Sequence, residues 1–210
     1  METVDTSWRL FIAVPLPPAV ITFVDGIIGE LSQEGWPVRW VAPEGAHLTL
    51  HFLGSTEPER AQLLRLALGP VVAGHPPFQL RTADFGAFPS IRRPRVIWLG
   101  LHGPAHRLAS LHAALGETLA AYEFEVAAEE QFHPHITLGR VRNVRDQSTR
   151  DLPAAIRQRL DELTKSGQVS HRNPIPLPVD EVRLMRSHLA RDGARYETIE
   201  RYPLVPSAQP

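Results

Sequence analysis

The segment HLTLHFLG at residues 47–54 recurs in the second half of the chain as HITLGRV at residues 135–141. Both segments alternate polar and apolar side chains, as β-strands with one buried face do. Side chains at positions i and i+2 of a strand point to the same face, so His47 and Thr49 share the face opposite to the leucines. Each segment therefore presents one histidine and one threonine away from its apolar face.

The elements that precede these segments also recur. An apolar strand, RLFIAV, starts at Arg9, and a similar strand, RVIWLG, starts at Arg95. Each is followed by a helix that begins at a proline, Pro18 in the first half and Pro104 in the second. The three elements follow in the same order at nearly equal spacing, which indicates an internal duplication. We expect the two similar halves to meet about a pseudo-twofold axis.

Hydrophobic periodicity predicts interleaved strands and helices. Predicted strands cover residues 9–14, 38–41, 47–53, 78–87, 95–101, 132–141, 179–189 and 196–203, the last two forming a hairpin around Asp192 and Gly193. The first predicted helix begins at Pro18, and three further helices are predicted over residues 58–73, 104–122 and 151–165. We predict an α+β fold of two pseudo-symmetric lobes, each an antiparallel or mixed sheet with helices on its outer face, with a central cleft between them. Residues 1–210 form one bilobal domain, in which residues 205–210 are a loose tail.

The apolar positions of three helices predict which side each one buries. In the order of the chain, the expected buried sets are Leu63, Leu64, Leu66, Ala67 and Val71, then Leu108, Leu111, Leu115 and Leu119, then Ile156, Leu160 and Leu163.

The composition is that of an ordinary soluble globular protein, with 43% hydrophobic and 21% charged residues. No apolar run is long enough to span a membrane, and we identify no signal peptide before Arg9. The chain has no cysteine, which excludes disulfides, thiolate catalysis and cysteine metal sites and favours the cytoplasm. Since the net charge is −1, any nucleic acid must bind through a local basic patch.

The paired histidines and threonines indicate a chemistry. A single His-x-Thr on a half-buried strand is ordinarily structural, but duplication of a core does not explain a histidine and a threonine on the opposite face in both halves. An imidazole has an ordinary pKa of about 6.5 and can act as general base or general acid at neutral pH. Threonine hydroxyls can donate hydrogen bonds to phosphoryl oxygens. Two of each around one small anion are typical of a phosphoryl-transfer site.

The sequence resembles the 2H phosphoesterase superfamily, and within it the bacterial RNA 2′,3′-cyclic phosphodiesterases, which are related to 2′-5′ RNA ligases. The resemblance covers residues 8 to 204. It is carried by RLFIAVPLP from Arg9, VRWVAPEGAHLTLHFLG from Val38, FGAFPSIRRPRVIWLG from Phe85, FHPHITLGRV from Phe132, and SHLARDGARYETI near the C-terminus.

The resemblance implies hydrolysis of a 2′,3′-cyclic phosphate to a 2′-phosphomonoester, with His47 and His135 as catalytic residues and no metal or other cofactor. It implies that Thr49, Thr137 and Arg140 bind the phosphate. Strict strand alternation would turn Arg140 away from the histidines, unless a bulge at Gly139 corrects the direction. The expected partner is RNA with a 2′,3′-cyclic phosphate end, bound by a monomer. Two alternatives stay open: reversible 2′-5′ ligation of tRNA halves as the main role, and a non-catalytic module that binds cyclic nucleotides or RNA.

Other residues near the motifs have less defined roles. His51 and His133 are expected to share faces with the catalytic pair, either tuning the site or lining its rim, and neither is expected to be catalytic. By strand parity, Phe52 is expected in the core and not as a platform for a base. A metal site of His47, His133 and His135 is disfavoured because neither motif contains a carboxylate. The arginines of the loop before the strand at residues 95–101 are either contacts to the RNA backbone or a solvated basic loop; they are Arg92, Arg93 and Arg95.

Overall fold

The computed structural model describes residues 7–124, 132–142, 151–165, 174–190 and 193–206. Its helices are α1 (Pro18–Ser32), α2 (Pro58–Ala73), α3 (Ala105–Ala121) and α4 (Leu152–Lys165), with a short 3-10 helix, η1 (Pro43–Gly45). Its strands are β1 (Trp8–Pro15), β2 (Val38–Trp40), β3 (His47–Thr56), β4 (Phe78–Phe88), β5 (Val96–His102), β6 (His135–Val141), β7 (Pro176–Val179), β8 (Glu181–Ala190) and β9 (Gly193–Pro203). None of the described helices is long and apolar enough to cross a membrane.

The described strands form one strongly curved sheet in the order β7-β4-β5-β6-β3-β1-β8-β9, and β2 pairs with β6 beside this path. Every described strand pair is antiparallel. The two motif strands, β3 and β6, meet at the centre through the single register pair Leu48–Ile136. Four strands of this path lie on each side of the seam, and β2 adds to the half with β6, so the α+β fold has two halves whose inner edges carry the two motifs.

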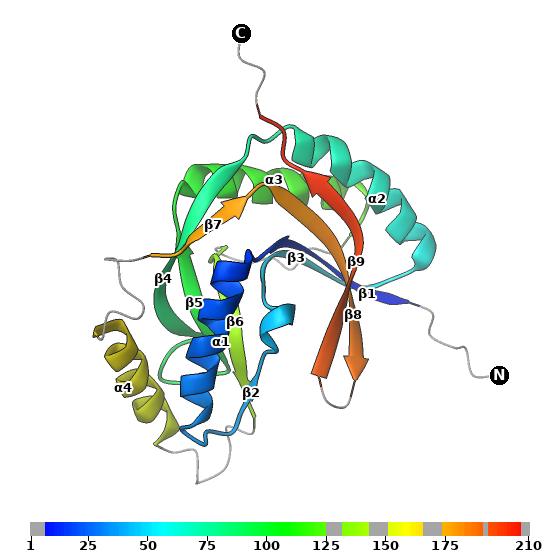
Figure 1. Cartoon of the computed structure of the whole chain (residues 1–210). Coiled ribbons are helices and arrows are strands. Elements are labelled where there is room, and N and C mark those ends of the chain that lie inside the picture. The colour runs from blue at the N-terminus through cyan, green and yellow to red at the C-terminus, as the bar shows by residue number, and fades with distance from the viewer. Residues whose placement is uncertain (1–6, 125–131, 143–150, 166–173, 191–192, 207–210) are drawn as a thin grey trace, which may run out of the picture.

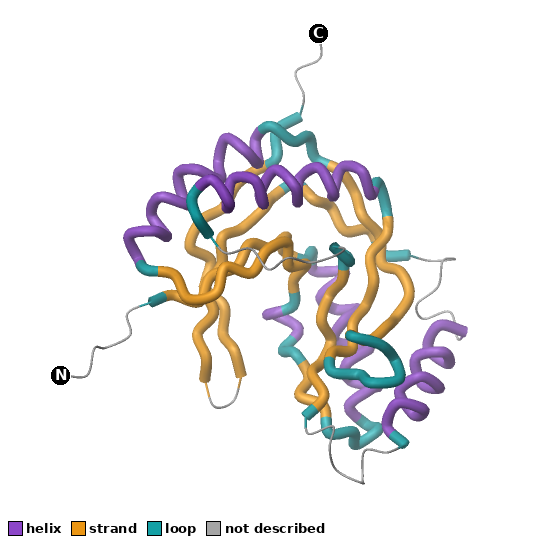
Figure 2. The backbone as a smooth tube through the Cα atoms, turned by 180° about the vertical axis from the view of Figure 1, so that it is seen from behind, coloured by secondary structure: helices purple, strands orange, loops and turns teal. Residues whose placement is uncertain are grey.

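Helices cover both halves of the sheet. Helices α2 and α3 pack side by side over the half that contains β3 and β9, while α1 and α4 pack against the half that contains β2 and β4 (Figures 1 and 2). As predicted, the buried sides of α3 and α4 include Leu108, Leu111, Leu115 and Leu119 and Ile156, Leu160 and Leu163, respectively. The layer of helices thus leaves the opposite face of the two central strands open for His47 and His135.

The predicted buried side of α2 is wrong for two leucines. Leu63 and Leu66 are 56% and 79% exposed, and the helix instead buries Ala61, Leu64, Leu68 and Val72. Apolar residues occupy more than one side of this helix, so periodicity alone does not select the buried one. The contacts with α3 and β9 select it, and the Tyr202 hydroxyl donates a hydrogen bond to the Arg65 carbonyl across that interface.

Most predicted boundaries agree with the structure to within two or three residues. The segment predicted as one strand over residues 179–189 is divided between β7 and β8, and β7 pairs with β4 in the other half of the sheet. The predicted turn residue Asp192 and the tail residues 207–210 lie outside the described residues.

Candidate active site

Each motif histidine is anchored by the backbone two residues before it. His47 Nδ1 lies 2.7 Å from the Gly45 carbonyl oxygen, and His135 Nδ1 lies 2.7 Å from the His133 carbonyl oxygen. A carbonyl can only accept, so Nδ1 of each ring carries the hydrogen and donates it. This fixes the tautomer and leaves Nε2 of each imidazole available for proton transfer.

The seam between the halves brings the two motifs together. Leu48 of β3 is paired with Ile136 of β6, so the histidine and threonine on either side of each of these residues flank the single pair that joins the two strands. We call the face that carries these four side chains the site face. All four are partly exposed there, while the apolar residues between them are fully buried. Neither threonine hydroxyl is engaged by another described residue, so both can donate to a ligand.

Burial changes the protonation of both histidines. It is the largest cause of the lowered pKa of His47 and of His135, and the hydrogen bond to the backbone carbonyl raises each value in part. The positive charge of Arg140 lowers both pKa values further, and His135 lowers that of His47. Both rings therefore favour the neutral form before an anion binds.

Aromatic rings enclose the histidines, and the sequence analysis did not identify them. The His47 ring stacks on Phe11 at a centroid distance of 4.7 Å and meets the edge of Tyr196 at 5.1 Å. The His135 ring meets the edge of Phe88 at 4.8 Å. For Phe11 the sequence did contain a signal, because residues of a strand alternate between its two faces and Phe11 therefore points away from its apolar neighbours in β1. Tyr196 comes from β9, far along the chain, and no local pattern connects it with His47.

A β-bulge shortly after each motif histidine decides which of the next residues reach the site face. The pairing of β1 with β3 skips Leu50, and the pairing of β5 with β6 skips Leu138. Both bulges fall three residues after the motif histidine, and each reverses the alternation beyond it. The residue five positions after each histidine, Phe52 in β3 and Arg140 in β6, is therefore turned toward the site face.

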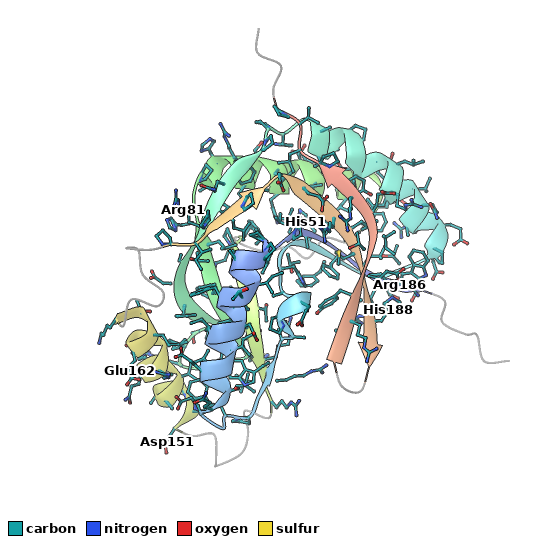
Figure 3. The ribbon with its side chains drawn as sticks, viewed as in Figure 1. His51, Arg81, Asp151, Glu162, Arg186 and His188 are labelled. Atoms are coloured by element: carbon teal, nitrogen blue, oxygen red, sulfur yellow. The ribbon has the colours of Figure 1, made fainter. Side chains whose placement is uncertain are left out.

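The bulge in β3 corrects two predictions. His51 is not on the site face: it is 5% exposed in the interior, where its Nε2 lies 2.8 Å from the carbonyl oxygen of His112 in α3 (Figure 3). Phe52 is not in the core: it is 54% exposed, and its ring lies 6.3 Å from that of Phe11. Strand parity failed for both residues because it assumes an unbroken ladder of pairs.

The bulge in β6 supports the expected position of Arg140. The bulge lies at Leu138, one residue before the expected position at Gly139. Gly139 is needed for another reason, because a Cβ atom there would lie 2.5 Å from Val38 and 2.7 Å from Trp40. The absence of a side chain lets β2 close against β6 beside Arg140.

The arginines of the loop after β4 differ in their position relative to β6: the Val141 amide donates a hydrogen bond to the Arg95 carbonyl oxygen at 2.9 Å, whereas Arg92 lies toward α4. Arg92, Arg93 and Arg95 are exposed, and Arg92 lines a hollow of about 540 Å³ between this loop and α4, where Glu162 also lies (Figure 3). None of the five predicted site residues lines this hollow. His133 is exposed and packs 4.6 Å from Trp98. Within the described ranges, no three histidine, aspartate or glutamate side chains are grouped as metal ligands.

Paired His-x-Thr strands at the seam of a two-lobed antiparallel sheet define the class of two-histidine, or 2H, phosphoesterases. Residues 25–191 match the 2′-5′ RNA ligase superfamily, and the chain belongs to that family. It is 36% identical to an RNA 2′,3′-cyclic phosphodiesterase of Escherichia coli over 94% of this chain and 97% of that protein. It is 29% identical to one of Methanothermobacter thermautotrophicus over 93% and 98%, respectively.

Solved structures show the same fold. A crystal structure of Escherichia coli LigT complexed with 3′-AMP superposes with a TM-score of 0.67 at 28% sequence identity, covering 94% of this chain and 98% of that one. A structure from Thermus thermophilus gives a TM-score of 0.68 at 27% identity, with coverage of 95% and 100%. The similarity therefore extends over nearly the whole chain.

Proposed function

We propose that this protein hydrolyses the 2′,3′-cyclic phosphate at the 3′ end of RNA to a 2′-phosphomonoester, using His47 and His135 as its acid–base pair and no metal. The observation that carries the proposal is the arrangement of the two imidazoles. Each is fixed through Nδ1 to a carbonyl oxygen, the register pair Leu48–Ile136 joins the two motif strands, and the positive charge of Arg140 lowers the pKa of both rings. The names of the relatives agree with this activity.

The proposed reaction is an in-line displacement at phosphorus. One neutral imidazole takes a proton from water as the oxygen attacks, and the bond between phosphorus and O3′ breaks. The other imidazole, protonated, gives its proton to O3′, so the product is a 3′ hydroxyl and a 2′-phosphate. The Thr49 and Thr137 hydroxyls donate to the non-bridging oxygens, and the Arg140 guanidinium stabilises the negative charge that develops on them.

The site also offers a contact for the RNA that carries the phosphate. Phe52 presents an exposed aromatic ring on the site face, on which a nucleobase can stack. If a 5′ hydroxyl of a second RNA replaces water, the same geometry would form a 2′-5′ linkage between tRNA halves. We propose hydrolysis as the main reaction and a monomer as the working form, because one chain supplies both motifs. We also propose that the protein works in the cytoplasm, where a chain without cysteine needs no disulfide.

The test of this function is to identify the product made without metal. We expect the protein to open an RNA 2′,3′-cyclic phosphate in excess EDTA, because the two imidazoles supply both proton transfers. Phosphorus NMR should show a 2′-phosphomonoester. A dominant 3′-phosphate would refute the proposed bond cleavage. Activity that is lost in EDTA and restored by zinc or manganese would refute the acid–base mechanism, and binding without turnover would indicate a binding module.

The pH dependence of kcat/KM should be bell-shaped, with its optimum on the acid side of the ordinary imidazole pKa of about 6.5. Activity requires one neutral and one protonated imidazole. Because burial lowers the pKa of both rings in the free enzyme, the protonated acid is lost at a lower pH than for an exposed histidine. Rates measured from pH 4 to 9 in a constant-ionic-strength buffer check this. An optimum above pH 7, or a flat profile, would contradict it.

A further inference from the structure

Two arginines lie side by side on the site face. Arg39 of β2 is the direct cross-strand partner of Arg140 of β6, and both side chains are exposed. Directly paired residues of antiparallel strands project to the same face, with Cβ atoms about 5 Å apart. Arg39 therefore extends the site face by one cation beyond Arg140.

This pairing is unfavourable unless an anion is present. Like charges directly opposite each other destabilise a strand pair, and neither arginine forms an ion pair with another residue in the part of the chain that the structure describes. The whole chain carries a net charge of −1, so a general excess of basic residues does not account for the pair. Two adjacent, unpaired guanidiniums are the arrangement that polyanion binding requires.

The position of Arg39 is fixed by the strand that carries it. Its neighbours Val38 and Trp40 pack where Gly139 lacks a side chain, so β2 is held tightly against β6. Figure 1 shows β2 beside the end of β6 that lies away from the seam with β3. Along β6, the site face thus presents His135, then Thr137, and then the Arg140 and Arg39 pair. An anion held by Arg39 lies beyond the one held between the histidines.

We propose that Arg39, together with Arg140, binds a second phosphate of the substrate, the phosphodiester on the 5′ side of the nucleotide that carries the cyclic phosphate. This proposal rests on the proposed function, because a cyclic phosphate at the 3′ end leaves only the 5′ side for further phosphates. It makes an oligoribonucleotide the preferred substrate over a nucleoside cyclic phosphate. Arg39 thus determines the preference for longer substrates and takes no part in the reaction itself.

The experiment compares substrates that differ by one phosphate. They are adenosine 2′,3′-cyclic phosphate, the same compound with a 5′-phosphate, and the dinucleotide ApA ending in a 2′,3′-cyclic phosphate. We measure kcat/KM for each with the wild-type protein, with Arg39→Gln and with the control Arg107→Gln. Arg107 is an exposed arginine of α3, in the helical layer, so its loss removes the same charge away from the site face.

We expect the ratio of kcat/KM for the dinucleotide to that for the nucleoside to fall about tenfold in Arg39→Gln, the usual effect of losing one charge-assisted contact. In Arg39→Gln, the kcat/KM of the 5′-phosphorylated nucleoside should also lose most of its advantage over that of the nucleoside, since the phosphate is what Arg39 recognises. The salt dependence for the dinucleotide should become shallower by about 0.7 in the slope of log(kcat/KM) against log salt concentration. Arg107→Gln should keep the wild-type ratio.

Three results would overturn the proposal. The first is an equal loss of Arg39→Gln on all three substrates, which would place Arg39 at the reacting phosphate or give it a structural role. The second is a wild-type protein that does not distinguish the substrates. The third is a melting temperature of Arg39→Gln well below that of the wild type, since removal of like-charge repulsion should not destabilise the fold. Failure of the wild-type protein on every cyclic phosphate would instead count against the proposed function.

Discussion

His47→Ala and His135→Ala are each expected to lower kcat by about 10²- to 10⁴-fold, the usual effect of removing one proton-transfer group. Both rings lie on the site face, and the residues buried beneath them, Leu48 and Ile136, are unchanged by the substitutions. Circular dichroism and thermal melting should therefore show folded variants. Single-turnover rates on an RNA 2′,3′-cyclic phosphate measure the loss.

The double variant of the two histidines separates a coupled pair from two independent groups. If the proton transfers are concerted, the double variant should lose much less than the product of the two single losses. A substrate with sulfur in place of O3′ needs little protonation of its leaving group, so it should rescue only the variant that lacks the acid. The control is His51→Asn, because His51 belongs to a motif strand but lies in the interior beside α3. Near-normal turnover by either folded histidine variant would refute the mechanism.

Arg140→Gln is expected to lower kcat/KM by about 10²-fold, the lower range found when one donor to a developing oxyanion is removed. The reason is that its positive charge lowers the pKa of both histidines, so we expect the guanidinium to stabilise the charge that develops on phosphorus between them. The loss should appear on the nucleoside as well as on the dinucleotide, in contrast to the loss of Arg39→Gln, which is expected only on substrates that carry the second phosphate. The same substitution should raise the pKa of both imidazoles, because a nearby positive charge disappears. Proton NMR titration of the histidines checks this shift.

The matched control for Arg140→Gln is again Arg107→Gln. An Arg140→Gln variant with wild-type kcat/KM would show that the bulge at Leu138 does not bring Arg140 to the phosphate. An unchanged histidine titration combined with a large loss of activity would indicate that the substitution disturbs the pairing of β6 with β2.

The site could be predicted from the sequence only where its residues lie within an unbroken stretch of strand. His47 and Thr49, like His135 and Thr137, are separated by one residue, and local alternation suffices to put each pair on one face. The aromatic rings around them could not be predicted, because Phe11 and Tyr196 come from strands whose positions beside His47 depend on the order of the sheet. The pairing of Arg39 with Arg140 has the same origin.

The sequence by itself determined the kind of protein this is. Its apolar periodicity fixed nearly all helices and strands, since each periodicity reflects local backbone geometry, and the recurrence of His-x-Thr-Leu fixed the class of chemistry that we propose. Only the tertiary structure decided at which residues the alternation of side chains between the two faces reverses along the motif strands. The bulges at Leu50 and Leu138 exist only when neighbouring strands pair out of step, and they bury His51, expose Phe52 and turn Arg140 toward the histidines. A strand's alternation is a local property, whereas its register is a property of two strands.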